Sequence, residues 1–250
     1  MSIRWRNYNV KRCVVGLRFA CQVLLPQVEG AKTGKVGFGE ALRPPGIKGI
    51  VLTSVLIMLA HFTFYTYIAP YLKDRGIPEN GVSGVLFAFG AAGVVGVRGA
   101  GVLVDKRPRG ALLWATGLMT FSMVGLALVT ELPVLTVALS VVLGLAYAAL
   151  PTLLQSASLK TAPATQDAAS ALFILAMNLG IFAGSGIGGQ ILEQLGVGAL
   201  PMAAAILAAV ATALVIAGRK HSFPTVAQLM ATRVERNGGT RRAREPEMVA

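Results

Sequence analysis

Two side chains that can exchange a proton or hydrogen-bond a ligand stand in the middle of a long apolar run. His61 and Tyr65 are four residues apart within 49–72, so on a helix they lie on one face. Ionisable groups at that depth in a hydrocarbon layer are costly and usually functional. The pair therefore has two interpretations of equal weight: a cavity position for ligand or proton exchange, and a hydrogen-bonded packing histidine.

Two further polar residues lie in later apolar runs. Tyr147 and Asn178 are weaker candidates for the same cavity, because either can instead hydrogen-bond one helix to another. Arg98 is close to a charged turn and can extend its guanidinium into water. No Asp or Glu lies in the middle of an apolar run. Among these residues His61 is therefore the one candidate for proton exchange near neutral pH.

The composition is that of a membrane protein. Hydrophobic residues make up 54% of the chain and charged residues 14%, against about 25% charged in soluble domains. The net charge of +12 gathers in the termini and short loops without an aromatic surface, which argues against nucleic-acid binding. Cys13 and Cys21 are eight apart with no nearby histidine, so we expect neither a metal site nor a cofactor.

Six apolar runs are each long enough to cross a bilayer as a helix. The sequence thus predicts an all-α membrane protein with six transmembrane helices, at 49–72, 81–104, 111–129, 132–154, 168–192 and 197–217. Eight Lys and Arg residues flank one side of these spans and two flank the other, which places both termini in the cytoplasm. Residues 1–48 read as a basic segment with an interfacial helix and a linker, and 218–250 as a basic cytoplasmic tail.

A short charged turn joins the second and third runs. Gly101, Leu103, Asp105, Lys106 and Arg109 lie where one helix ends and the next begins. An acidic residue at a helix C-terminus is poorly placed unless another group holds it, because that end carries partial negative charge. Asp105 either belongs to a solvated loop or meets the N-terminus of another helix.

Small residues recur every four positions in the second and fifth runs. Residues four apart share a helix face, and small side chains let another backbone approach closely. We therefore interpret these rows as tight helix–helix seams, although Gly and Ala are also generally common in membrane helices. The rows are Gly84, Ala88, Ala92, Gly96 and Ala100, and Ala176, Gly180, Gly184 and Gly188.

These motifs carry a family resemblance. Residues 49–220 resemble the C-terminal half of a major facilitator superfamily transporter, close to the bacterial drug–proton and sugar efflux permeases. The turn Gly101-x-Leu103-x-Asp105-Lys106-x-x-Arg109 resembles the superfamily's loop motif, with Pro108 where a glycine is usual. The stretch 168–189 resembles the eleventh helix of these permeases.

The resemblance implies a location, a mechanism and a partner. It implies an inner-membrane protein that exports small molecules, with the first and fourth helices of each half lining a central cavity. It assigns both small-residue rows to the interface with a six-helix N-terminal half, or with a second copy, and offers Asp105 a partner there. Any coupling carboxylate would belong to that other half.

Two other classes of protein remain in view. One is a non-transporting membrane fragment or partner-binding subunit, which the residues alone do not separate from a half-transporter. The other is an intramembrane hydrolase, suggested by Ser185 in Ala-Gly-Ser-Gly. The hydrolase is disfavoured because the first glycine of a GxSG pattern is absent and the membrane histidine lies in a distant span. We expect a protein that is not an enzyme.

Overall fold

The computed structural model describes residues 39, 42–44, 46–129, 131–162 and 165–218. Within them the chain is helical, and six helices are long and apolar enough to cross a membrane, which confirms the predicted six-helix bundle. Most of the basic segment expected at 1–48 and of the tail expected at 218–250 lies outside the described residues, and α3 already starts at Ile47. The helices are α3 (Ile47–Tyr65), α4 (Ile68–Asp74), α5 (Glu79–Lys106), α6 (Pro108–Leu128), α7 (Pro133–Thr161), α8 (Gln166–Leu195), the 3₁₀ turn η1 (Val197–Ala199) and α9 (Leu200–Ala217).

The first span is divided, whereas the sequence predicts one continuous helix over 49–72. α3 ends at Tyr65 and α4 starts at Ile68. Polar contacts with α8 hold the break. The Thr66 hydroxyl lies 3.0 Å from that of Ser185, and the Tyr67 hydroxyl donates to the Ser185 carbonyl at 2.9 Å. Pro70 is a local signal for this break that the prediction did not use, because in a continuous helix its ring would clash with the carbonyl of Thr66 and it has no N–H to donate there.

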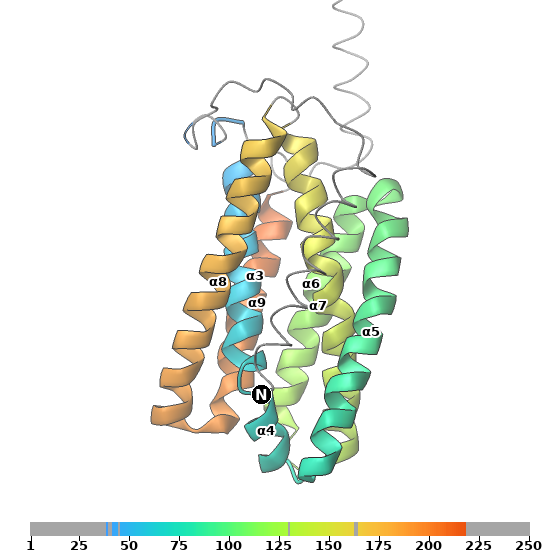
Figure 1. Cartoon of the computed structure of the whole chain (residues 1–250), viewed down its shortest axis with the longest axis vertical. Coiled ribbons are helices and arrows are strands. Elements are labelled where there is room, and N and C mark those ends of the chain that lie inside the picture. The colour runs from blue at the N-terminus through green and yellow to red at the C-terminus, as the bar shows by residue number, and fades with distance from the viewer. Residues whose placement is uncertain (1–38, 40–41, 45, 130, 163–164, 219–250) are drawn as a thin grey trace, which may run out of the picture. The chain divides into compact units, whose positions relative to one another are not determined.

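Figure 1 shows α5 and α8 at opposite edges of the bundle, with α6 and α7 between them. α3 packs against both α8 and α9, α7 packs against α5 and α6, and α6 also packs against α9. Buried side chains from these helices form one continuous apolar core. The six helices therefore share one core, and their packing places α3, α5 and α7 around a common interior.

The small-residue row of α8 forms a seam with α3. A Cβ added at Gly184 would lie 2.6 Å from the Leu59 carbonyl oxygen, and one at Gly180 would lie 2.6 Å from Met58 Cβ. Gly188 meets the Thr63 backbone in the same way. The prediction of a tight seam on this row fits these contacts, but its assignment to another half is wrong. α3 of the same bundle already occupies the row.

The row on α5 does not form a single face. Gly96 abuts the Leu145 backbone of α7 and Ala100 is buried, whereas Gly84 is exposed with nothing near its missing Cβ. Ala88 and Ala92 are half-buried. Successive steps of four residues rotate the row by about 40° each, because a helix turns about 100° per residue. The expected interface row therefore winds from the outer surface of α5 into the bundle, and its assignment to another half fails at Gly96 and Ala100.

Candidate functional site

An aromatic cluster joins the three helices that surround the interior. The His61 ring on α3 stacks on the Tyr147 ring of α7, with centroids 3.4 Å apart and planes at 3°. Tyr65, one turn later on α3, stacks on His61 at 4.9 Å. Phe89 of α5 lies 5.0 Å from Tyr65. The structure thus brings together three of the four predicted cavity residues.

His61 is fully buried, at 0% exposure, inside this cluster. Neither ring nitrogen has a hydrogen-bond partner among the described residues. The Tyr147 hydroxyl donates instead to Met58 Sδ at 3.6 Å. A buried polar atom without a partner costs about 1–3 kcal/mol. In this arrangement His61 is therefore neither open to a ligand, as the first interpretation requires, nor the hydrogen-bonded packing residue of the second.

Asn178 does not join the cluster, and its assignment to a cavity stays a prediction. It is exposed on α8, and its Nδ2 donates to the Ile174 carbonyl at 2.8 Å. The reason is angular. Asn178 lies two residues from both Ala176 and Gly180, so its side chain leaves the helix about 160° away from the seam with α3.

The charged turn is a near-continuous helix junction. α5 runs through Lys106 and α6 starts at Pro108, a residue suited to the first helical position. Arg109 donates from Nη2 to the Ile216 carbonyl of α9 at 3.3 Å. Lys160 of α7 donates to the Val104 carbonyl of α5 at 3.2 Å. Both cations thus stabilise helix C-termini, which favour positive charge.

The other residues of the loop motif lie at the end of α5. Gly101 and Leu103 are exposed on the last turns of α5. Lys106 is also exposed and ends that helix. Asp105 lies in the same helical turn, its side chain is outside the described residues, and its partnership with another helix stays a prediction.

Sequence reasoning missed Phe89. A single phenylalanine in an apolar run carries no signal by itself, because many apolar residues would fill a core. Its position is fixed by Gly144 of α7, whose missing Cβ would overlap the Phe89 carbonyl and ring. Gly144 therefore lets α5 approach α7 closely enough for Phe89 to reach the cluster. Predicting the role of Phe89 would have required knowing that α5 packs against α7.

The outer surfaces of the helices differ in polarity. Among described residues, the exposed side chains along α6 beyond its first turn and along α9 are all apolar, as with Trp114, Phe121 and Ile206. By contrast, α5 exposes Arg98 beside Phe87, and α8 exposes Asn178 beside Phe182. Polar groups at lipid-facing positions are costly and usually turn toward protein or water. The outer faces of α5 and α8, which each expose such a polar side chain, are thus better suited to protein contact than those of α6 and α9.

Residues 20–164 match the Major Facilitator Superfamily. The chain belongs to this superfamily. It is 32% identical over 193 residues to a probable sugar efflux transporter of Mannheimia succiniciproducens, covering 75% of this chain and 48% of that protein. It is 30% identical over 209 residues to the chloramphenicol efflux pump MT0201 of Mycobacterium tuberculosis, covering 78% of this chain and 51% of the pump. The chain thus spans about half the length of these curated relatives.

The fold also resembles a solved transporter. The crystal structure of the POT family transporter PepTSo, determined in meso, aligns with a TM-score of 0.64 at 17% identity. The alignment covers 73% of this chain and 39% of that one. Together with the six apolar helices, these findings identify a multi-pass membrane protein with a major facilitator bundle.

Proposed function

We propose that this chain is the C-terminal half of a transporter that exports small molecules, with sugars and chloramphenicol-like compounds as first candidates. The observation that carries the proposal is its identity of 30–32% to two efflux proteins over three quarters of its length. The loop motif at 101–109 and the stretch at 168–189 support assignment to the C-terminal half. Transport would follow from rocking of two bundles about a site near the membrane midplane.

A second six-helix bundle is the partner in this proposal. The relatives are about twice as long as the matched region, and the outer faces of α5 and α8 offer surfaces for it. On α5, Gly84, Phe87, Ala91, Val94 and Arg98 are spaced three and four apart and are not covered in the bundle. This spacing, unlike the four-residue row, keeps a constant face. These faces replace the small-residue rows as the expected contact with the other half.

The proposal includes an orientation in the inner membrane. The end that carries Arg109 and Lys160 would face the cytoplasm, together with both termini, because Lys and Arg concentrate on the cytoplasmic side. The turn between α4 and α5, where Lys73 pairs with Glu79 at 2.6 Å, would face outward.

His61 is the proposed proton-exchanging group of this half. Histidine side chains within membrane spans commonly relay protons in transporters, and His61 occupies a costly buried position without hydrogen bonds among the described residues. Groups kept at such a cost often serve function. Proton exchange would require the stack of His61 with Tyr147 to open during the transport cycle.

Co-expression tests the function. An efflux-deficient bacterium expresses the chain alone, the chain together with the half of the Mannheimia transporter that it does not match, or neither protein. We expect reduced accumulation of radiolabelled sugar or chloramphenicol only when both halves are present. Efflux by the chain alone, shown to be monomeric by crosslinking, would contradict the half-transporter proposal. An assembled pair that exports neither compound would favour a non-transporting subunit.

A further inference from the structure

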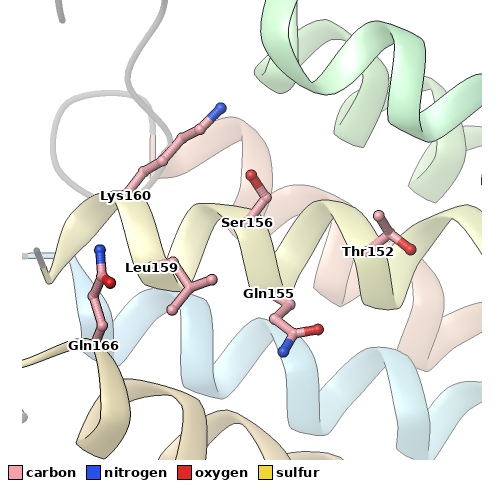
Figure 2. Close-up of a pocket in the computed structure, with 6 residues that line it drawn as sticks. All are labelled: Thr152, Gln155, Ser156, Leu159, Lys160 and Gln166. Atoms are coloured by element: carbon pink, nitrogen blue, oxygen red, sulfur yellow. The ribbon is translucent and has the colours of Figure 1, made fainter. Parts of the chain in front are cut away.

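An open cavity of about 420 Å³ lies where the end of α7 meets the start of α8. Figure 2 shows five of its six lining residues on successive turns of α7 and the sixth on the first turn of α8. This volume falls in the range of about 300–1,000 Å³ typical of small-molecule sites. The lining residues are Thr152, Gln155, Ser156, Leu159, Lys160 and Gln166.

The hydroxyl groups in this cavity are unusual for their helix. Elsewhere on α7, Thr136, Ser140 and Thr161 donate to the carbonyl four residues earlier, at 2.8–3.3 Å. This arrangement satisfies a hydroxyl within an apolar bundle. Thr152 and Ser156 make no such bond, and no other partner for them is found in the described part of the chain.

The two amides are also available. The side-chain amides of Gln155 and Gln166 have no hydrogen-bond partner within the described residues, and both side chains are exposed at the cavity opening. Four side chains that can each donate and accept hydrogen bonds therefore surround one hollow. Lys160, in contrast, donates to the Val104 carbonyl of α5.

We propose that this cavity binds an uncharged molecule rich in hydroxyl groups, such as a saccharide or polyol. Hydroxyl and amide side chains each donate and accept, as do the hydroxyls of such a ligand. The lining contains no carboxylate for a cation. Its one ammonium group is already bonded to a helix C-terminus, which argues against an anion. Leu159 supplies an apolar surface for the C–H face of a ring.

The cavity lies on the same helix as the aromatic cluster. Thr152 is five residues after Tyr147, or about 7.5 Å along the axis of α7. It lies toward the basic end, where Lys160 and Arg109 bond the ends of other helices. Under the proposed function and orientation, the cavity is thus a cytoplasmic entry position for a substrate on its way to the centre.

Protection of a cysteine from labelling tests the binding site without transport. In a chain with Cys13→Ser and Cys21→Ser, reconstituted in lipid nanodiscs, Ser156→Cys is labelled with N-ethylmaleimide. We expect maltose to slow this labelling saturably, by about threefold at twice the dissociation constant, since the free fraction is 1/(1 + [L]/Kd). Glucose 6-phosphate and choline serve as charged probes and should protect much less. Ser83→Cys on exposed α5 is the matched control and should be unaffected by any of them.

The second variant is Gln155→Leu in the same background. It should abolish protection by maltose, because it removes one amide and leaves the volume similar. Saturation-transfer NMR with maltose on the otherwise unchanged chain and on Gln155→Leu should give the same difference without an added cysteine. No protection at any soluble concentration of maltose, or stronger protection by a charged probe, would overturn the proposal. Loss of efflux with protection intact would reject the proposed function and leave this site standing.

Discussion

Gly184 offers a direct test of the seam between α3 and α8. A Cβ at this position would lie 2.6 Å from the Leu59 carbonyl oxygen and 3.0 Å from Leu59 Cα. Both are backbone atoms, so the clash cannot be relieved by rotating a side chain. Gly186 lies two residues further along the same helix, and an added Cβ there meets nothing within 4 Å. Gly184→Ala and Gly186→Ala therefore form a matched pair.

The size of the effect follows from the difference between the two variants. Each substitution gains the same helix propensity, about 1 kcal/mol for Gly to Ala, so this contribution cancels. What remains is the cost of forcing α3 away from α8. Overpacking of a well-packed interior typically costs about 1–3 kcal/mol. We expect Gly184→Ala to be less stable than Gly186→Ala by about 2 kcal/mol, or roughly thirtyfold in the unfolding equilibrium constant.

Unfolding by sodium dodecyl sulfate, titrated into mixed micelles and followed by circular dichroism, measures this difference. The two variants are compared at one protein concentration, so that association between chains contributes equally. Equal stability of the two proteins would refute the assignment of Gly184 to the α3–α8 seam. Loss of association with a partner half, with bundle stability unchanged, would restore the interface that the sequence predicts for this row.

Three further predictions concern other parts of the molecule. His61→Phe keeps a ring in the stack and removes the unpartnered nitrogens, so it should raise bundle stability by about 1–3 kcal/mol in the same titration. The same variant should abolish proton-driven export by the paired halves, and unchanged export would make His61 a packing residue. Arg109→Ala should lower stability by about 0.3–1 kcal/mol, because the C-terminus of α9 loses a cation, whereas full stability would mean that the bond to Ile216 contributes nothing. Cysteines at Asn80 and Asp167, both exposed, should differ in labelling by an impermeant maleimide on intact cells, with Asn80 reacting, and equal labelling would contradict the topology.

Much of the fold could be predicted from the sequence because bilayer-spanning helices need long apolar runs. The runs at 81–104 and 168–192 differ from α5 and α8 by only two or three residues at each end. The break between α3 and α4 was missed, although Pro70 lies four residues after Thr66 and disfavours a continuous helix there. The contacts with Ser185 of α8 that also hold the break come from a residue more than a hundred positions away and could not be read from the local sequence.

The candidate site was predicted in part. His61, Tyr65 and Tyr147 were identified as polar groups at mid-span, and they do meet. Asn178 was included on the same criterion, but depth in the membrane gives no information on which side of a helix a residue faces. The cavity at Gln155 was missed because its residues lie near a helix end, where polar side chains are ordinary.

The small-residue rows show a related difficulty. A spacing of four is a sound indication of close helix approach, and Gly180 and Gly184 do meet another backbone. The spacing does not say which helix approaches. Without contact information, a seam inside the bundle and one with a partner have the same pattern.

The proposed pairing of two halves depends most directly on which outer faces of this bundle the second bundle covers. Four exposed aromatic residues can each be replaced by photoreactive benzoylphenylalanine: Phe87 on α5, Phe182 on α8, and Trp114 and Phe121 on α6, with exposures of 79%, 81%, 79% and 64%. After irradiation of cells that also contain the complementary half, the account predicts crosslinks to that half from Phe87 and Phe182. Trp114 and Phe121 should give adducts with lipid alone. Crosslinks to the partner from the two α6 positions, and none from α5 or α8, would contradict it.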